Sequence, residues 1–387
     1  MCRLHSLSDR EGGKERIDTK GFDLTTIYIN GRFLSRPITG VQRYSREVLR
    51  ELDSLLEDAD DTIRVEVLIP RNVNNAPNYR NLAVRKVGIL SGHAWEQIEL
   101  PLYSLRGVLF TPGGGAPLIH PRNIVTIHDA SVFAAPSGYS FRYRQWYVFL
   151  YRVLCRTAMH ILTVSNFSKA EIVAWCGAKP DEITVTYLGS EHANAVPSDN
   201  SILQRHNLRK YGYVLAVSSR NPNKNFDGII SALSFLGAPD MEVAIAGNTI
   251  SHVFKDASFE PSAVKDLGYV TDEELKSLYE NAGCFVFPSF YEGFGLPPLE
   301  ALSLGCPVVV GNVASMPEIF EGMALFCDPH DPRDIAEKIR KALDTCGDSA
   351  SRMAVSKRAA RYKWSICAQK TWKVLRAAAR GELGLPS

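Results

Sequence analysis

Short runs of consecutive apolar residues alternate with longer stretches of helical periodicity along most of this 387-residue chain. Because the apolar residues of these runs are continuous, they indicate strands covered on both faces, as in a parallel sheet. Strands are expected at 25–29, 64–70, 123–128, 160–165, 213–219, 242–247, 284–289 and 307–312. Helices are expected between them at 42–56, 140–157, 168–176, 225–236, 272–281, 297–304 and 332–344, with a last one near 363–380. This alternation predicts an α/β protein with doubly wound sheets.

A polar segment at 193–211, "ANAVPSDNSILQRHNLRKY", interrupts the pattern and predicts a boundary between two domains. We expect a first Rossmann-like domain at 23–196 and a second at 211–371, with a helix at about 372–387 crossing back to the first. Residues 1–22 read as a disordered tail, because they are polar and lack the apolar core of a signal peptide. A cleft between two such domains is where a ligand is expected to bind.

Composition excludes several classes of function. The net charge of +2 is too small to favour nucleic acid as a partner, and no run approaches the roughly 18 apolar residues of a membrane span. The eight cysteines are scattered without a Cys-x-x-Cys pair, which favours a reducing, cytoplasmic location and no zinc site. The sequence "DAD" at 58–60 has the spelling of a metal-binding Asp-x-Asp but lies far from the other motifs.

The segment "YEGFGLPPLEAL", residues 291–302, places Glu292 and Glu300 on either side of two glycines and two prolines. The glycines let the backbone approach a ligand and turn its N–H groups toward an anion, and the prolines suit a first helical turn. One acid then lies in a loop after a strand, and the other lies in the first turn of the next helix. This arrangement suits a ligand with phosphate in its middle and hydroxyls at both ends, such as a nucleotide-sugar.

This segment resembles the Glu-x7-Glu signature of the group-1 family of retaining glycosyltransferases, which have the GT-B fold of two Rossmann-like domains facing a cleft. The resemblance covers roughly Ile27 to Trp372. It implies that the first domain, 23–196, lies on the acceptor side and that the second, 211–371, binds the nucleotide-sugar. Further blocks occur in the family's order: "TGVQRYSREVL" (39–49), "VTIHDAS" (125–131), "TVSNFSKAEI" (163–172), "NPNKNF" (221–226), "LGYVTDEEL" (267–275) and "MPEIF" (316–320).

The resemblance implies a role for each residue of the donor site. Glu292 would contact the donor sugar near the reacting carbon, and Glu300 would bind the ribose hydroxyls. Lys224 would bind phosphate, with Ser219 or Arg220 beside it. The remaining donor contacts would come from the backbone of the glycine-proline segment and from the block at 267–275, through Gly293, Phe294, Gly295, Leu296 and Val270.

Two residues of the first domain are candidates on the other side of the cleft. Gly40 resembles the glycine loop that faces the diphosphate, although an ordinary helix cap explains a single glycine there almost as well. His128 ends a strand, and in the family this histidine lies by the donor sugar; the alternative is a histidine satisfied in the core. The predicted catalytic residues are therefore His128, Lys224 and Glu292.

Two further segments leave alternatives open. "TPGGGAPL" (111–118) is either a flexible cleft loop near the acceptor or an ordinary loop. "FRYRQWYVFLYRVLCR" (141–156) is a buried helix, with Trp146, Phe149, Leu150 and Val153 at core spacing, or a basic aromatic helix that lies on a membrane.

The resemblance implies a retaining glycosyltransferase that moves a hexose, with mannose favoured, in surface polysaccharide synthesis. The segments "NPNKNF" and "VTIHD" resemble those of mannosyltransferases that use GDP-mannose, so this donor is expected in preference to a UDP-sugar. The resemblance also implies an acceptor hydroxyl on a glycan or polyprenyl-linked saccharide and no catalytic metal. The predicted location is cytoplasmic, with peripheral contact at the inner face of the plasma membrane left open. The alternatives are a non-catalytic GT-B-like scaffold and a dehydrogenase or epimerase, but "YINGRFLSRPITG" (28–40) lacks the glycine fingerprint that the latter needs.

Overall fold

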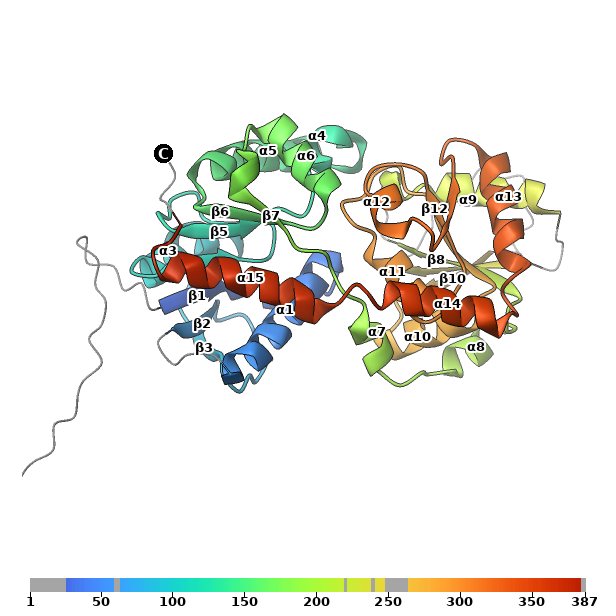
Figure 1. Ribbon diagram of the computed structural model, residues 1–387, viewed down its shortest axis with the longest axis horizontal. Coiled ribbons are helices and arrows are strands. Elements are labelled where there is room, and N and C mark those ends of the chain that lie inside the picture. Colours follow the sequence, from blue (N-terminus) through green and yellow to red (C-terminus); the bar gives the residue numbers. More distant parts are fainter. Residues whose placement is uncertain (1–25, 59–62, 219–220, 238–240, 248–263, 384–387) are drawn as a thin grey trace, which may run out of the picture.

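The computed structural model describes residues 26–58, 63–218, 221–237, 241–247 and 264–383. They form two parallel β-sheets, each covered by helices, which lie next to one another along the long axis of the molecule (Figure 1). The predicted tail, residues 1–22, lies outside the described residues.

The first sheet has the order β3-β2-β1-β4-β5-β6-β7, and all of its strand pairs are parallel. The chain moves outward from β1 to β3 and then returns to place β4 on the other side of β1. In doubly wound sheets, ligands bind at the carboxyl ends of the two strands where the order reverses. The strands are β1 (Thr26–Asn30), β2 (Arg64–Ile69), β3 (Ala83–Lys86), β4 (Val108–Thr111), β5 (Asn123–Thr126), β6 (His160–Thr163) and β7 (Ile183–Val185).

The second sheet has the same doubly wound, parallel arrangement, with the order β10-β9-β8-β11-β12-β13. The direction of its strand order therefore reverses between β8 and β11. Strands β8 and β11 carry continuous apolar sequences because helices cover both faces of the sheet. The strands are β8 (Tyr213–Ser218), β9 (Glu242–Gly247), β10 (Val264–Gly268), β11 (Cys284–Phe287), β12 (Val308–Gly311) and β13 (Leu325–Cys327).

Helices and short helical turns connect the strands. Those before the second sheet are η1 (Gly31–Ser35), α1 (Gly40–Leu55), η2 (Leu56–Asp58), α2 (Gly92–Ala94), η3 (Trp95–Glu99), α3 (Leu100–Ser104), α4 (Ser131–Ala134), η4 (Pro136–Gly138), α5 (Phe141–Thr157), α6 (Asn166–Cys176), η5 (Pro180–Glu182), α7 (Glu191–Ala195) and α8 (Ser201–Arg205). Those after its first strand are η6 (Pro222–Lys224), α9 (Phe226–Leu236), α10 (Asp272–Asn281), α11 (Leu296–Ser303), α12 (Met316–Phe320), α13 (Pro332–Leu343), α14 (Ser349–Ala359) and α15 (Trp364–Ala379).

Helix α5 is buried along a different face from the one expected. Tyr147, Leu150, Tyr151 and Leu154 form its buried stripe, whereas Phe149 is 53% exposed. Trp146 and Val153 are only half-buried. The predicted core position is therefore confirmed for Leu150 and wrong for Phe149, whereas Trp146 packs against the core without being fully buried.

The chain crosses between the sheets twice. The first crossing follows β7, since α7 already packs against α11 of the second domain, and it therefore comes before residue 196, where the sequence placed the boundary. The second crossing precedes α15 (Trp364–Ala379), which matches the helix expected near 363–380, so the chain returns to the first domain before the expected residue 372. Helix α15 packs along α1, β1 and β4 of the first domain (Figure 1).

The two crossings touch and form a single hinge. Both carboxylate oxygens of Glu191 accept a hydrogen bond from the backbone N–H of Trp364 at 3.0 Å. A Cβ atom at Gly189 would lie 2.2 Å from the same nitrogen, so only glycine allows the two crossing segments of the chain to approach this closely. The hinge positions the two domains with their sheet ends facing a common cleft.

Candidate active site at the cleft between the domains

Lys224 and Glu292 meet where the order of the second sheet reverses. Lys224 follows β8 and Glu292 follows β11, and Lys224 Nζ lies 2.5 Å from Glu292 Oε1. Nζ also lies 4.8 Å from the centroid of the Phe287 ring, within range of a cation–π contact. The two side chains are 22% and 15% exposed, so this ion pair is partly shielded from water while remaining open to a ligand.

Asparagines hold the loop that carries Lys224. Asn221 accepts a hydrogen bond from the backbone of Asn223, and Asn225 adopts a left-handed conformation with φ of 55°. The side-chain amide of Asn225 donates to the carbonyls of Pro288 (3.1 Å) and Pro329 (2.6 Å). These bonds tie the block at 221–226 to the end of β11. The predicted phosphate ligands Ser219 and Arg220 lie outside the described residues.

Glycine is required at two places in the segment after Glu292. A Cβ atom at Gly293 would lie 2.8 Å from the carbonyl oxygen of His128, in the first domain. Gly295 has φ of +88° and caps α11, and a Cβ there would lie 2.9 Å from Met316. Gly293 therefore permits close contact with the first domain, and Gly295 permits the left-handed turn at the start of α11.

The neighbouring residues can offer only their backbone to a ligand. The side chain of Phe294 is 4% exposed and packs beside Tyr187 and Tyr362, and Leu296, the first residue of α11, is also buried. Because α11 begins at Leu296, Glu300 is its fifth residue and lies in the second turn. The expectation of Glu300 in the first turn was therefore wrong.

The carbonyl of Gly293 is held by two serines of the first domain. Ser165 Oγ donates to it at 2.6 Å and Ser168 Oγ at 3.2 Å. These serines belong to the block at 163–172, which the sequence marked without assigning a role to its residues. The bonds place the glycine segment directly against the carboxyl edge of the first sheet.

A second contact between the domains uses the start of α6. The carboxylate of Glu318 accepts hydrogen bonds from the backbone N–H groups of Asn166 and Phe167, both at 2.8 Å, and from the Tyr187 hydroxyl at 2.8 Å. A carboxylate at a helix N-terminus is stabilised by the orphan N–H groups and the helix dipole. The blocks at 163–172 and 316–320 thus join the two domains.

His128 lies two residues beyond β5, and its backbone carbonyl lies against Gly293 of the second domain. Its Nε2–H donates to the carbonyl of Pro112 at 2.9 Å, and its ring meets the edge of Tyr44 at 4.7 Å. Burial lowers the pKa of the imidazole, which favours the neutral form at pH 7. Gly40 is exposed at the start of α1, and no heavy atom lies within 4 Å of where its Cβ would be.

Glu300 lies in a buried hydrogen-bonded chain that begins at the hinge. Its carboxylate, 8% exposed, accepts from His192 Nε2 at 2.8 Å and from the Tyr279 hydroxyl at 3.3 Å. Trp364 Nε1–H donates to His192 Nδ1 at 2.9 Å. An indole N–H can only donate, so this bond places the histidine proton on Nε2, where it points at Glu300. Burial, followed by the charge of Glu300, raises the pKa of Tyr279 well above its usual range and keeps its hydroxyl a donor.

An ion pair crosses the cleft beside Glu300. Arg43 of α1 and Asp272 of α10 lie 2.5 Å apart, and both line a small pocket together with His192, Tyr279 and Glu300. Val270 is half-buried two residues before α10 and does not line this pocket. Arg43 and Asp272 lie in the blocks at 39–49 and 267–275, but neither they nor His192 were assigned a role, because their partners are distant in the chain.

Within the described ranges, no group of three or more His, Cys, Asp or Glu side chains is arranged to hold a metal ion. None of the described helices combines the length and apolar composition needed to cross a membrane.

Comparison with known proteins places the chain in a family. Residues 199–361 match the family described as Glycosyl transferases group 1. The O-antigen chain mannosyltransferase B of Escherichia coli is 31% identical over 372 residues, covering 87% of this chain and 95% of that protein. The chain belongs to the group 1 glycosyltransferases.

Two further comparisons agree with this assignment. The O-antigen chain mannosyltransferase RfbU of Salmonella typhimurium is 29% identical over 61% of this glycosyltransferase and 64% of its own length. The sucrose-phosphate synthase structure from Thermosynechococcus elongatus superposes with a TM-score of 0.69 at 15% identity, covering 92% of this chain and 99% of that one. The predicted GT-B fold and glycosyltransferase activity are confirmed, and the dehydrogenase alternative is excluded.

Proposed function

We propose that this glycosyltransferase moves mannose from GDP-mannose to a hydroxyl of a glycan or polyprenyl-linked saccharide during surface polysaccharide synthesis, with retention of the α configuration. The observation that carries the proposal is the contact between Lys224 and Glu292 at the sheet reversal. The similar mannosyltransferases named above support mannose as the sugar and a surface polysaccharide as the product.

Lys224 and the start of α11 are suited to bind the diphosphate. When the bond between sugar carbon and phosphate oxygen breaks, negative charge develops on that oxygen. Lys224 Nζ and the backbone N–H groups after Gly295 then stabilise it. A new bond forms between the acceptor oxygen and the sugar carbon on the same face, and the departing phosphate takes the acceptor's proton. The proposed reaction needs no catalytic metal, since the lysine and the helix terminus supply the positive charge.

Glu292 and His128 are proposed to contact the donor sugar from opposite domains. Glu292 accepts hydrogen bonds from sugar hydroxyls, and its pairing with Lys224 holds its carboxylate beside the phosphate position. His128 is kept in one tautomer by Pro112, which leaves Nδ1 as the acceptor. Gly40, on α1, is proposed to let the diphosphate approach the backbone of the first domain.

Glu300 is proposed to bind the ribose hydroxyls of the nucleotide. It lines the pocket with Arg43 and Asp272, and His192 and Tyr279 hold its carboxylate in one orientation. The nucleotide hydroxyls would take over or share these hydrogen bonds.

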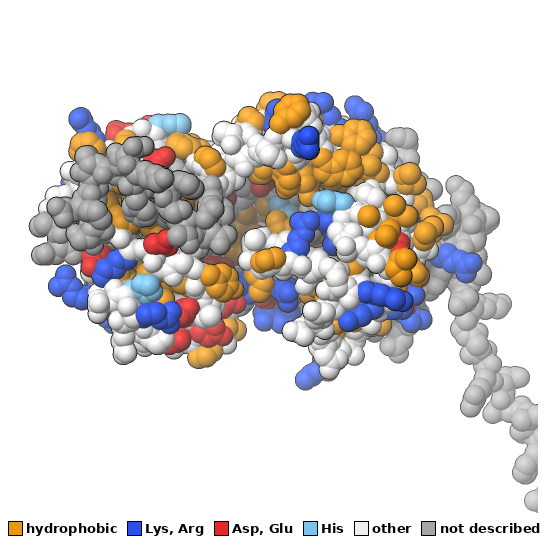
Figure 2. Space-filling model, turned by 180° about the vertical axis from the view of Figure 1, so that it is seen from behind, with side chains coloured by type: hydrophobic (Ala, Val, Ile, Leu, Met, Phe, Trp, Pro, Cys, Tyr) orange, Lys and Arg blue, Asp and Glu red, His pale blue; other side chains and the backbone are white. Residues whose placement is uncertain are grey.

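Part of the first domain is proposed to rest on the anionic inner face of the membrane, where a polyprenyl-linked acceptor would be reached. Phe141 and Phe149 of α5 are 74% and 53% exposed. The exposed Arg152 and Arg156 follow on the same helix. Figure 2 shows hydrophobic side chains gathered on this half of the molecule with basic groups around them. We expect the protein to sediment with anionic vesicles but not with zwitterionic ones, and the double variant Phe141→Ser/Phe149→Ser to lose this binding. Equal sedimentation of the variant and the parent would exclude this contact.

A panel of nucleotides tests the donor assignment. In calorimetry, GDP is expected to bind more tightly than UDP, with and without EDTA, and Glu300→Ala is expected to weaken GDP binding at least tenfold. Hydrolysis of GDP-mannose, measured with and without acceptor, separates an active transferase from a non-catalytic scaffold. Equal affinity of Glu300→Ala and parent for GDP would show that the ribose assignment is wrong.

A further inference from the structure

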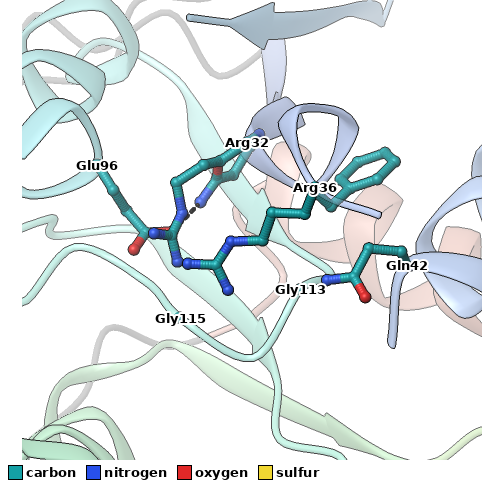
Figure 3. Close-up of a pocket in the computed structure, with 8 residues that line it drawn as sticks. Arg32, Arg36, Gln42, Glu96, Gly113 and Gly115 are labelled. Atoms are coloured by element: carbon teal, nitrogen blue, oxygen red, sulfur yellow. Dashed lines mark hydrogen bonds and ion pairs between the residues drawn. The ribbon is translucent and has the colours of Figure 1, made fainter. Parts of the chain in front are cut away.

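A second polar pocket opens at the sheet reversal of the first domain. Arg32 and Arg36, which follow β1, line it together with Gln42 of α1, Glu96 of η3, and Gly113 and Gly115 of the loop after β4. Figure 3 shows the guanidinium groups of Arg32 and Arg36 next to one another, with Glu96 on the far side of Arg32.

The pocket adjoins the reaction centre. Gly113 directly follows Pro112, whose carbonyl accepts the hydrogen bond from His128 Nε2 at 2.9 Å. The carboxyl ends of β1 and β4, which carry these loops, face the second domain across the cleft. A group bound in the pocket would therefore lie beside the sugar that Glu292 and His128 contact from the donor side.

Arg32 and Glu96 form a buried pair with one unused atom on each partner. Arg32 is 4% exposed and Glu96 is 1% exposed. Arg32 Nε lies 2.9 Å from Glu96 Oε1, which also accepts from Asn30 Nδ2 at 2.8 Å. Arg32 Nη1 and Glu96 Oε2 have no hydrogen-bond partner among the described residues, and His93 Nδ1, at 3.6 Å from Oε2, is too distant for one. A buried polar atom without a partner costs about 1–3 kcal/mol, so a ligand that pairs both atoms gains that energy.

Gly115 leaves room beside this pair, next to the unused Glu96 Oε2 and to Arg32 Nη2. A Cβ atom at this position would lie 2.9 Å from Arg32 Nη2 and 3.1 Å from Glu96 Oε2. Any side chain would thus cover the pair. This explains the third glycine of the "TPGGG" segment, for which the sequence left a cleft loop and an ordinary loop as alternatives.

The two unused atoms call for different ligand chemistry. Arg32 Nη1 is a donor and needs an acceptor, whereas Glu96 Oε2 is an acceptor and needs a donor. Phosphate or carboxylate could satisfy Arg32 and the exposed Arg36, but it would be repelled by Glu96 and would leave Oε2 unpaired. Neighbouring hydroxyls of a neutral saccharide both accept and donate, so they satisfy both atoms at once.

We propose that this pocket, defined by Arg32, Arg36, Glu96 and Gly115, binds the hydroxyls of a neutral saccharide unit of the acceptor. The proposal rests on the proposed function and deepens it, because it assigns the part of the acceptor that is recognised as sugar rather than phosphate. Arg36 adds hydrogen-bond donors at the open rim of the pocket. At its base, Arg32 donates to one saccharide hydroxyl and Glu96 accepts from its neighbour.

The test measures binding of methyl α-mannoside to the full chain in the presence of GDP, by saturation-transfer NMR. Gly115→Ala changes no charge and places a methyl group over the pair, so we expect it to weaken saccharide binding at least tenfold. Glu96→Gln, which replaces the acceptor by an amide, is expected to do the same. Gly347→Ala is the matched control, since no heavy atom lies within 4 Å of its Cβ position. Inorganic phosphate is the anionic competitor.

Equal affinity of the parent and Gly115→Ala for methyl α-mannoside would overturn the proposed subsite, and so would the absence of binding to the parent. Bridging water would then be the partner of the Arg32–Glu96 pair. Competition by inorganic phosphate would overturn it in favour of an anion site. A variant that only lowers the thermal unfolding temperature, with unchanged saccharide affinity, would also refute it. GDP binding by the same samples reports on the proposed donor chemistry separately, so failure of the subsite is distinguishable from failure of the proposed function.

Discussion

Replacing Lys224 by alanine removes the cation that lies closest to the predicted position of the leaving phosphate. Removal of one donor that stabilises developing negative charge costs about 3–4 kcal/mol in well-enclosed sites. Lys224 is 22% exposed, and the backbone N–H groups at the start of α11 remain in the variant, so water and the helix terminus replace part of the loss. We therefore expect a loss of about 2–3 kcal/mol, or about 30- to 150-fold in turnover.

The assay is the steady-state rate of transfer from GDP-mannose to a saccharide acceptor, with kcat and donor KM measured separately. The loss is expected mainly in kcat, because the charge develops only as the bond breaks. Lys224→Arg should recover part of the rate, since it keeps the charge but not the point geometry.

Lys341→Ala is the matched control for this prediction. Lys341 Nζ also lies close to a carboxylate, 2.6 Å from Glu337 Oε1, but both side chains are about half exposed on α13, away from the cleft. This variant should leave the rate unchanged. A kcat for Lys224→Ala within tenfold of the parent would show that Lys224 does not stabilise the leaving group.

Two further predictions concern stability. Trp364→Phe removes the buried hydrogen bond to His192, so we expect the free energy of unfolding in urea to fall by about 2 kcal/mol and GDP binding to weaken. Trp175 is 45% exposed, and the control variant Trp175→Phe should change neither quantity. Unchanged GDP affinity of Trp364→Phe would show that the indole does not orient His192. Burial lowers the pKa of His120 to about 4. As pH falls below about 6.5, the unfolded chain therefore binds a proton at this histidine that the folded chain does not bind. The free energy of unfolding should consequently fall by about 2 kcal/mol between pH 7.5 and pH 5. His120→Gln should flatten this dependence, and equal slopes for parent and variant would contradict it.

Most of the larger strands and helices could be predicted because each contains enough residues to show a pattern. Helix α14 was missed although it has 11 residues, because only Ala359 of it is buried and its sequence therefore lacks an apolar stripe. Five strands were missed, β3, β4, β7, β10 and β13, and each has three to five residues. Strand β4 lies in the centre of the first sheet, yet its four residues between Gly107 and Pro112 are too few to display either periodicity. The other four, β3, β7, β10 and β13, are the edge strands of the two sheets and are incompletely buried, so their sequences lack the continuous apolar character of the centre.

The site was predictable where it depends on local chain geometry. The family resemblance assigned Lys224 and Glu292 to one donor site, and the structure brings them together because loops after neighbouring strands of one parallel sheet lie at the same edge. The hinge contacts had no such local signal: His192 and Trp364 are 172 positions apart, and only the return of the last helix brings them together. The Arg32–Glu96 pair was missed for the same reason, since it depends on how η3 packs beside the end of β1.

The return of α15 has a consequence for biosynthesis. This helix packs against α1, and its residues Trp364, Cys367, Val374 and Leu375 are all buried in the finished molecule. During translation, α1 therefore emerges more than 300 residues before its covering helix, and its apolar face stays uncovered until residue 379 has left the ribosome. The first half of the protein is thus the last to complete its core, and a nascent chain stopped before Trp364 should attract chaperones rather than persist as a finished domain.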